Sequence, residues 1–567
     1  MTARLPLLAR WLLPRCCVER GAGCRRAPYF KRVSGMPDVK KVVFFSPFAF
    51  IWPHALPEHQ LAQLLHDQGL AVKVIGCRKS YSTLCTAMEA AHVDVGDDQS
   101  VKDRICTRCI GNSEILKKAF RALEFSAIED YPLDDVPEPR VAVPENPEQM
   151  LDCTVDGVEI GRIALYETLI KFKKFNMELS PVERVHFEAS FLNALKVLRQ
   201  ATAVLRAEKP DVVVCYSPQY DIPGVFAAVA AREGIRTVFI EGSSNDVERY
   251  SHLRMWDWDT HGLSQPAISV PDRFAAYKLT AEGAGRARRL MDIRARAAAF
   301  SAYTSAARNA SPYEVFGLDK NRKYILMAMS SYDEVYSGYI IRRLPRTRFE
   351  GRVFKNQIEW LKETIDWAAF HPEIQMVVRP HPREFPNKRE GVSSPHVKEW
   401  APILASLPPN VKIDHPDMKF SLYDHLEHAD ALVTGWSSVG VEALSKGLPV
   451  VTYDEALPTF PKSIHYSGSS KAEYFENILR ALKDTDRERH TQDALRWLAY
   501  TCEVGTVRIG GRFNDRFPIF TKLKARRYLR EFGSRWVDVL FPPAGRDVGR
   551  VLGLVRGEGM SLFELPE

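Results

Sequence analysis

The feature that most constrains the fold is a repeated order of strand, helix, glycine and strand in the first half of the chain. The run Lys41–Phe45 is rich in β-branched and aromatic residues, and the helical stretch Glu58–Asp67 follows a proline-containing loop. Gly69 ends that helix, and the strand Leu70–Ile75 begins directly after it. This order is the start of a βαβ unit, with both strands in one parallel sheet. It is repeated further on in Asp211–Cys215, Val225–Arg232, Gly234 and Thr237–Ile240.

A second set of strands and helices follows a polar stretch whose Ala/Arg run, 284–299, is typical of a solvated helix face. The new set consists of Tyr324–Ala328, Gln357–Phe370, Ile374–Val378, Tyr423–His428, Ala431–Val433, Val439–Lys446 and Pro449–Thr452. Two such sets predict an α/β protein with two doubly wound, Rossmann-like domains that face a cleft. We expect an N-terminal domain at 36–270, a helical link at 271–320, a C-terminal domain at 321–500 and a helical tail at 501–567.

The positive net charge is confined to the N-terminus. The chain has 78 Lys and Arg residues and 71 Asp and Glu residues, a net charge of +7. Residues 1–35 hold eight bases and one acid and account for the whole excess. Because the remaining chain is neutral, the composition does not support a basic nucleic-acid-binding surface.

Three explanations fit residues 1–35. The apolar stretch Leu5–Leu13 is interrupted by Arg10 and is short for a secretory signal. An Arg-rich, acid-poor leader also resembles a transit peptide. We favour the third explanation, in which Met36 is the true start, because the first strand begins only a few residues later. No run in the chain reaches the ~18 apolar residues of a membrane span.

The segment 429–451 carries the strongest functional signal. Its strand ends at Thr434, Gly435 permits a sharp turn, and Ser437 is a good N-cap for the helix that follows. The first N–H groups of that helix have no partner within it and favour an anion. The hydroxyls of Ser437 and Ser438 add donors, and Glu442, one turn further on, can accept hydrogen bonds from ribose. An ordinary capped helix is the alternative.

The second signal is the sequence Arg379-Pro-His-Pro382, directly after the strand Ile374–Val378. Two prolines fix the backbone on either side of His381. The carboxyl end of a strand is where open α/β sheets bind ligands, and a guanidinium at Arg379 with a fixed imidazole suits a diphosphate. Met329–Asp333, after the preceding strand, predicts a further loop on the phosphate side. A proline-stiffened surface loop is the alternative.

Together, these two segments resemble bacterial GT-B glycosyltransferases of the capsule and surface-polysaccharide group. That group includes transferases that use CMP-Kdo and the CDP-glycerol glycerophosphotransferases of teichoic-acid synthesis. The resemblance covers roughly residues 320–455. It implies that His381, Ser437 and Ser438 hold the donor phosphates and that Glu442 contacts the nucleotide sugar hydroxyls. The extended ending motif of the Kdo enzymes is absent after Val451.

The function implied by this resemblance is sugar or polyol-phosphate transfer from a nucleotide-activated donor, linked to CMP, CDP or UDP. The acceptor is a growing capsule or lipopolysaccharide-type glycan, free or lipid-linked. Protein cations do the work of a metal in this expectation, so catalysis needs no cofactor. Two alternatives stay open: a nucleotide-sugar 2-epimerase of the same fold and a non-catalytic polysaccharide assembly subunit. We expect a cytoplasmic protein with peripheral contact to the inner membrane.

An inverting transfer needs a general base near the acceptor hydroxyl. Glu241 follows a strand of the N-terminal domain and is the predicted base. His54, Glu58 and Asp221 also lie near strand ends and compete with it. The alternative for Glu241 is a turn carboxylate without a catalytic role.

Four of the ten cysteines, Cys77, Cys85, Cys106 and Cys109, lie close together in the N-terminal domain. The final Cys-x₂-Cys spacing suits a tetrahedral metal, and four thiolates would complete a structural zinc site in an insert at 77–109. Four reduced thiols are the alternative. A disulfide framework is not favoured, because the other cysteines show no framework spacing.

The stretch Arg512–Phe541 mixes bases with apolar and aromatic residues. A helix of this composition can lie on an anionic bilayer. The alternative is that the C-terminal part of the chain crosses back and packs on the first domain, with its apolar face in the core.

Overall fold

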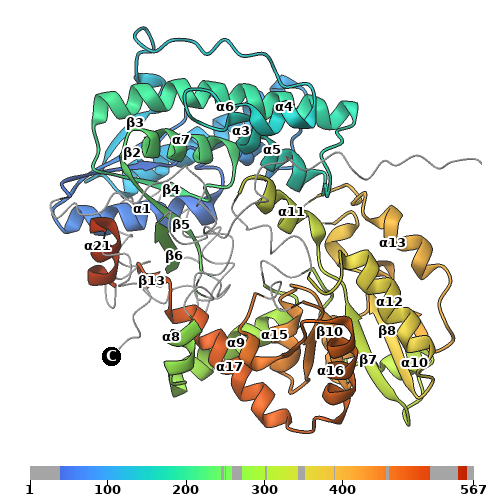
Figure 1. Ribbon diagram of the computed structural model, residues 1–567. Helices are drawn as coiled ribbons and strands as arrows, with labels where there is room; N and C mark the ends of the chain where they lie inside the picture. Colours follow the sequence, from blue (N-terminus) through green and yellow to red (C-terminus); the bar gives the residue numbers. More distant parts are fainter. Residues whose placement is uncertain are drawn as a thin grey trace, which may run out of the picture.

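The computed structural model describes residues 39–243, 248, 251–257, 271–299, 303–342, 352–387, 390–454, 459–510 and 547–557. It shows two α/β domains, with the N-terminal domain at the top of Figure 1. The leader at 1–35 and the basic, aromatic stretch at 512–541 lie outside the described residues.

The N-terminal domain is built on a seven-stranded sheet. Its strands are, in spatial order, β13 (Thr506–Arg508), β6 (His252–Asp257), β5 (Arg236–Gly242), β4 (Val212–Tyr216), β1 (Lys41–Phe45), β2 (Ala71–Gly76) and β3 (Glu124–Ala127). The strands from β5 to β3 are parallel, whereas β6 pairs antiparallel with both β5 and β13. The direction of strand addition reverses between β1 and β4, which makes the sheet doubly wound.

Helices cover both faces of this sheet. Val42 and Phe44 of β1 lie in one hydrophobic cluster with α1 (Trp52–Asp67) and α3 (Gln99–Ala119). Val43 and Phe45 lie in the opposite cluster with α6 (Pro181–Glu208) and α7 (Asp221–Arg232). This two-sided burial explains why the central strands are continuous apolar runs in the sequence. The remaining elements are α2 (Thr86–Glu89), η1 (Ile128–Asp130), α4 (Pro147–Asp152) and α5 (Ile160–Lys171).

The C-terminal domain repeats this plan with six parallel strands. Their spatial order is β12 (Tyr466–Ser467), β11 (Val450–Thr452), β10 (Ala431–Thr434), β7 (Lys323–Ala328), β8 (Ile374–Arg379) and β9 (Val411–Ile413). One face packs with α10 (Pro312–Phe316), α14 (Leu422–Leu426) and α15 (Val439–Leu444). The other face packs with α11 (Tyr332–Ile340), α12 (Gln357–Ala369), α13 (Val397–Leu404) and α16 (Lys471–Lys483). Single 3₁₀ turns are η4 (Pro382–Glu384), η5 (Pro416–Met418) and η6 (Lys462–Ile464).

The predicted fold class is confirmed in its architecture: the protein is α/β, with two doubly wound domains. All eight strands expected from the sequence are present, with ends that differ by at most two residues from the prediction. The strands that the sequence did not predict are β3, β6, β9, β12 and β13, which are edge strands or neighbours of an edge.

The two domains are joined by helices in the segment that the sequence analysis described as a polar link. The link contains α8 (Pro271–Ala276) and α9 (Ala281–Ala295). The Ala/Arg run has two sides: Arg288 and Arg289 are exposed, as expected, whereas Ala287 and Leu290 of α9 are buried in the core with α17 (Arg487–Glu503). This packing fixes the direction of α9 and, with it, the position of its last turn.

The C-terminal part of the chain crosses back to the first domain. Val507 of β13 pairs with Leu253 of β6, and α21 (Val548–Arg556) packs beside the same sheet through Val551 and Leu554. Figure 1 shows α21 next to α1, far from the other C-terminal helices. The described parts of 501–567 thus include a sheet strand and a docked helix, whereas the stretch Arg512–Phe541, for which packing and membrane contact were the alternatives, lies outside the described residues.

The domains also contact each other directly through α5 and α11, which lie side by side in Figure 1. Arg162 donates a hydrogen bond to the Ile340 carbonyl at 3.0 Å, and Arg342 pairs with Glu159 at 2.7 Å. The first turn of α11 follows β7, so this contact joins the N-terminal domain to a loop at the carboxyl edge of the second sheet.

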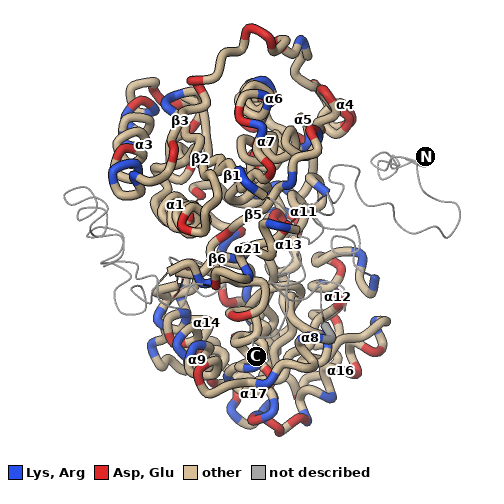
Figure 2. Tube along the Cα trace, turned by 90° about the vertical axis from the view of Figure 1, so that its left-hand side faces the viewer, with Lys and Arg blue, Asp and Glu red and all other residues tan. Residues whose placement is uncertain are grey.

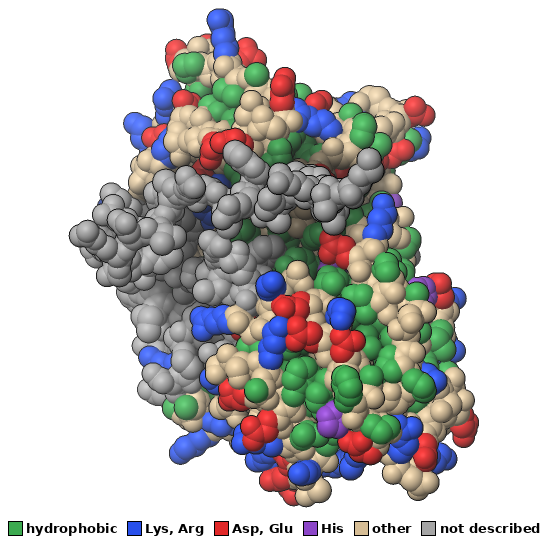
Figure 3. All heavy atoms as spheres, turned by 45° about the vertical axis from the view of Figure 1, so that its right-hand side comes forward, with side chains coloured by type: hydrophobic (Ala, Val, Ile, Leu, Met, Phe, Trp, Pro, Cys, Tyr) green, Lys and Arg blue, Asp and Glu red, His purple; other side chains and the backbone are tan. Residues whose placement is uncertain are grey.

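The surface charge agrees with the neutral composition of the folded chain. In Figure 2 basic and acidic residues are interspersed along the backbone of both domains, and their side chains are interspersed on the face that Figure 3 shows. None of the described helices is both long and apolar enough to cross a membrane.

The start of α5 gives a test of this packing. A Cβ atom added at Gly161 would lie 2.1 Å from the Met150 carbonyl oxygen, whereas one at Gly111 in α3 meets nothing within 4 Å. We expect Gly161→Ala to lower the free energy of unfolding by about 1–3 kcal/mol through overpacking. Gly111→Ala should raise it by about 0.5–1 kcal/mol, because alanine favours a helix interior. Denaturant unfolding of both variants measures the difference, and equal effects would contradict the tight contact at Gly161.

Candidate functional site

A pocket opens at the carboxyl ends of β7, β8 and β10, the edge where open parallel sheets bind ligands. It encloses about 630 Å³ of space, including solvent at its mouth. Side chains reach it from the strand ends, from α9, α14 and α15, and from the loop before α10. The lining includes Arg294, Tyr303, Arg379, His381, Tyr423, Ser437, Ser438 and Glu442. The structure therefore brings together all five donor-site residues that the sequence predicted.

His381 enters the pocket as a neutral hydrogen-bond donor. Burial lowers its pKa from 6.5 to about 4, and the nearby Arg383 charge adds to this effect. Its Nδ1 accepts a hydrogen bond from the Arg383 backbone N–H at 3.2 Å, which leaves the proton of a neutral ring on Nε2. The site thus offers an N–H group, rather than a positive charge, to an anion.

Arg379 lines the pocket, but its guanidinium is also engaged with the protein. It is 8% exposed and forms an ion pair with Asp414. It also donates to the Phe420 carbonyl at 3.2 Å and to the Thr304 hydroxyl at 3.3 Å. Because Asp414 balances its charge and these bonds use several of its N–H groups, Arg379 helps to shape the pocket wall, and its contact with phosphate stays a prediction.

Arg294, at the end of α9, is a charged pocket residue that the sequence analysis did not identify. Its Nη1 lies 3.4 Å from Glu442 Oε1, a longer contact than a strong ion pair makes. Its buried Nε has no hydrogen-bond partner among the described residues. Arg294 therefore has donor capacity to spare, unlike Arg379. No local sequence pattern marks it, because it reaches the pocket only through the packing of α9 on α17.

Glu442 is held in a fixed orientation at the first turn of α15. Tyr423 donates to its Oε2 at 2.7 Å, and Ser438 donates to its Oε1 at 3.2 Å. The side chain is buried but lines the pocket. A carboxylate held in this way can accept hydrogen bonds from vicinal hydroxyls, as predicted for ribose.

The serine turn is formed by close packing around Gly435. A Cβ atom at Gly435 would lie 3.0 Å from the Tyr453 ring and 3.2 Å from the Ser330 hydroxyl. The helix begins at Val439, as expected, but its N-cap residue is Ser438, and Ser437 accepts a long hydrogen bond of 3.4 Å from the Val439 N–H. Both serines line the pocket, as the sequence predicted. The predicted N-cap at Ser437 is weak, because the hydrogen bond from the Val439 N–H to its hydroxyl is 3.4 Å long.

The loop Met329–Asp333 contributes differently along its length. Met329 lines the pocket. Asp333, by contrast, is 1% exposed and pairs with Arg383 at 2.8 Å, behind the pocket wall. This loop therefore supports the site more than it contacts a ligand.

On the N-terminal domain, Glu241 ends β5 with both carboxylate oxygens engaged. Oε1 accepts from Gln219 at 2.9 Å, and Oε2 forms an ion pair with Arg254. His54 lies close by, because its ring stacks on Tyr216 at 4.2 Å and the Tyr216 hydroxyl accepts from the Gly242 N–H at 2.8 Å. Glu241 and His54 both stay candidates for the base.

The other two base candidates are withdrawn from solvent. Glu58 is 4% exposed and accepts a 2.5 Å hydrogen bond from Ser46, and burial raises its pKa to about 8. Asp221 is 0% exposed, and burial raises its pKa to about 7. Neither side chain is in a position to contact an acceptor hydroxyl.

The four clustered cysteines line one small cavity in the N-terminal domain. All four are free thiols. Burial raises the pKa of Cys77 to about 12 and that of Cys109 to about 11, which keeps both neutral. In the described part of the chain, no three His, Cys, Asp or Glu side chains are arranged to hold a metal ion. The cysteines thus meet around a cavity, and their described geometry does not form the predicted zinc site.

Comparison with known proteins gives only distant structural similarity. No family model and no curated protein matches the chain. A Kdo transferase, KpsC of Thermosulfurimonas dismutans, is 14% identical over 53% of this chain and 82% of its own, with a TM-score of 0.30. A UDP-GlcNAc 2-epimerase from Neisseria meningitidis is 12% identical over 82% of this chain and 96% of its own, with a TM-score of 0.27. The calicheamicin glycosyltransferase CalG4 is 13% identical over 82% of this chain and 95% of its own, with a TM-score of 0.25. At these scores the similarity is distant, and the function proposed below depends on the pocket residues.

The neutral state of His381 predicts a pH dependence of stability. Between about 4 and 6.5 the ring is protonated in the unfolded chain but not in the folded one. The unfolded state then binds more protons, so the contribution of His381 to the free energy of unfolding is complete above 6.5 and falls as the pH drops toward 4. His381→Gln should remove the part of the pH dependence of the unfolding free energy that His381 causes. Denaturant unfolding of the wild-type and variant proteins between pH 4 and 6.5 measures this change. The difference between the two proteins above pH 6.5 serves as the reference. A difference that is independent of pH would contradict a neutral, buried His381.

Proposed function

We propose that the protein is a glycosyltransferase that moves a sugar from a nucleotide-activated donor to a hydroxyl of a surface glycan. The observation that carries the proposal is the composition of the pocket. A neutral imidazole N–H, two serine hydroxyls and a guanidinium with spare donors lie around one space, beside a carboxylate fixed by Tyr423. Hydrogen-bond donors for phosphate next to an acceptor for ribose hydroxyls are what a nucleoside phosphate requires.

In this proposal the donor phosphates bind to His381 Nε2–H, Ser437, Ser438 and Arg294, and Glu442 accepts from the ribose hydroxyls. The bond from the anomeric carbon to the phosphate oxygen breaks as the acceptor oxygen bonds to that carbon. Negative charge develops on the leaving phosphate, and donors already in place stabilise it at little reorganisation cost. Arg294 takes the role of the cation, which the sequence had assigned to Arg379.

The acceptor proton passes to a base on the N-terminal domain, and we retain Glu241 for this role. Its ion pair with Arg254 and hydrogen bond from Gln219 orient the carboxylate, although the acceptor hydroxyl must then share Oε1 with Gln219. His54, stacked on Tyr216, is the competing base. The resemblance noted from the sequence favours a capsule or lipopolysaccharide-type acceptor, which would bring the enzyme to the cytoplasmic face of the inner membrane.

Incubation of the protein with CMP-, CDP- and UDP-linked sugars tests this function. Release of free nucleotide that requires a glycan acceptor supports a transferase. Sugar epimerisation without an acceptor would instead support the 2-epimerase alternative, and absence of turnover would leave the assembly-subunit alternative. In the active reaction, His381→Ala should reduce turnover by about 10²–10³-fold, the usual effect of removing one preorganised donor. Near-normal turnover in a folded His381→Ala protein would exclude this site.

A comparison of two arginines tests the assignment of the cation. Arg294→Ala should reduce turnover by about 10²-fold and leave the fold intact, because Glu442 keeps Tyr423 and Ser438 as partners. Arg379→Ala leaves the buried Asp414 with His425 at 3.0 Å but without its guanidinium, and should cost about 3–5 kcal/mol of stability. Steady-state kinetics and thermal unfolding separate the two effects. The reverse pattern, with Arg294→Ala unstable and active, would contradict the assignment.

A further inference from the structure

The N-terminal domain holds the loop of the C-terminal domain that carries His381. The chain leaves α5 at Lys173, whose φ of 51° lies in the left-handed region that residues other than glycine rarely adopt. The Lys173 side chain then crosses to the other domain. Its Nζ donates to the carbonyls of Phe385 at 2.7 Å and Val392 at 2.6 Å. The backbone carbonyl of Lys173 accepts a hydrogen bond from the Ser394 hydroxyl at 3.1 Å.

This contact is buried and therefore costly to break. Lys173 is 0% exposed, and burial lowers its pKa to about 8. An ammonium group withdrawn from water needs partners for its donors. The two carbonyls supply them, and Glu390 and Asp333 oppose the loss of the positive charge. Removing the side chain would take the Lys173 donor from the Val392 carbonyl, whereas the Phe385 carbonyl would keep the Asn387 side chain at 3.1 Å.

Arg383 connects this contact to the pocket. Its side chain is 4% exposed and forms ion pairs with Asp333 at 2.8 Å and Glu390 at 2.7 Å. Its Nη2 also donates to the Ile170 carbonyl, in the last turn of α5, at 3.3 Å. The backbone N–H of the same residue donates to Nδ1 of His381. One residue therefore contacts the N-terminal domain through its side chain and fixes the tautomer of His381 through its backbone.

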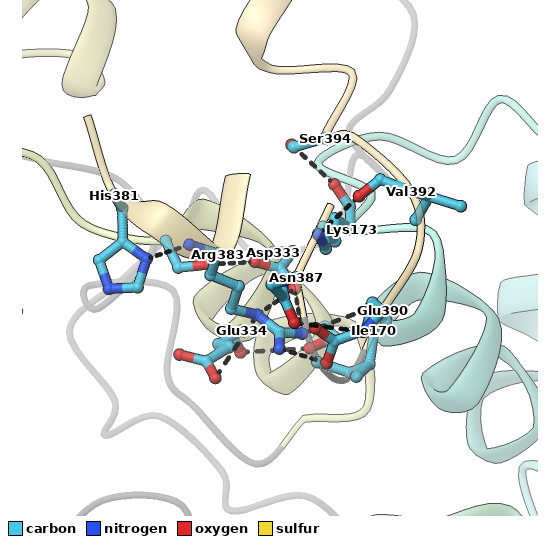
Figure 4. A network of polar contacts seen from close by, with 12 residues as sticks. Ile170, Lys173, Asp333, Glu334, His381, Arg383, Asn387, Glu390, Val392 and Ser394 are labelled. Atoms are coloured by element: carbon cyan, nitrogen blue, oxygen red, sulfur yellow. Dashed lines mark hydrogen bonds and ion pairs between the residues drawn. The ribbon is translucent and has the colours of Figure 1, made fainter. Parts of the chain in front are cut away.

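Figure 4 shows this order of contacts. Lys173, Val392 and Ser394 lie at one end, Arg383 reaches into the acidic groups in the middle, and the His381 ring points away at the other end. The chain of contacts joins two rigid elements, α5 and β8, that belong to different domains. Such a chain can transmit a loss of contact at Lys173 to the position of the imidazole.

We propose that Lys173 is a positioning residue of the donor site: the N-terminal domain, through Lys173 and the Arg383 network, holds His381 in the orientation that binds the donor phosphate. The donor pocket, although lined by C-terminal residues, is then complete only when α5 is seated on the loop. This inference rests on the proposed function for its ligand, but the hold of Lys173 on the His381 loop exists independently of any ligand.

The matched control is the neighbouring lysine. Lys174 is also buried, at 6% exposure, and pairs with Glu183 at 3.0 Å inside the N-terminal domain. Lys174→Met removes the same charge at the end of the same helix without touching the other domain. Lys173→Met removes the interdomain contact, and Lys173→Arg restores a charged donor at that position.

The first measurement is hydrogen exchange of the full-length protein over residues 381–394, where the Arg383 amide reports directly on the bond to His381. We expect faster exchange in Lys173→Met, no change in Lys174→Met, and partial recovery in Lys173→Arg. The second measurement is the affinity for CMP, CDP and UDP by calorimetry. Lys173→Met should weaken whichever nucleotide binds by about 3- to 30-fold, the range of coupling through packed contacts.

The outcomes separate this inference from the proposed function. Faster exchange with unchanged nucleotide affinity would overturn the positioning role and leave Lys173 as a structural clamp. Exchange that is the same in Lys173→Met and Lys174→Met would overturn the hold on the loop. If the wild-type protein binds none of the three nucleotides, the proposed donor site fails and its positioning residue with it, while exchange still decides whether Lys173 holds His381.

Discussion

The buried ion pair between Asp333 and Arg383 is the interaction on which the rest of the site depends. It joins the loop after β7 to the loop after β8, and both side chains are almost completely withdrawn from water. A buried charge pair of this kind is stable only when its remaining donors and acceptors are satisfied. Glu390 and the Ile170 carbonyl supply partners for Arg383, and Ser331 supplies one for Asp333. The pocket wall and the domain contact are thus parts of one network.

The central parts of the fold were predictable because they are buried on both sides. A parallel strand covered by helices is a continuous apolar run between turn residues, and Lys41–Phe45 and Ile374–Arg379 both have this form. The strand His252–Asp257 and its neighbour at the sheet edge, Thr506–Arg508, were not predictable. They pair with each other across about 250 residues of sequence, and neither is a continuous apolar run. Their pairing, not their local sequence, makes them strands.

The difference between local sequence pattern and long-range contact also explains which site residues could be predicted. His381, Ser437 and Ser438 directly follow strands and could be found from the local pattern of proline, glycine and hydroxyl residues. Arg294 could not be found, because its position depends on apolar contacts between α9 and α17 that begin about 200 residues apart. Arg379 was assigned to phosphate for the opposite reason. Its sequence neighbours suggested a ligand, while its true partner, Asp414, lies 35 residues further on.

The three arginines at the pocket differ in what their partners leave available. Asp414 neutralises Arg379, and Asp333 with Glu390 neutralises Arg383, so neither guanidinium contributes a free charge to a ligand. Arg294 faces Glu442 across a longer contact, so its charge is the least balanced of the three. In the proposed site, a phosphate is bound by this one cation together with directed N–H and O–H donors. Directed donors stabilise an anion only at fixed positions, which explains why so much buried structure, extending into the other domain, is devoted to holding His381.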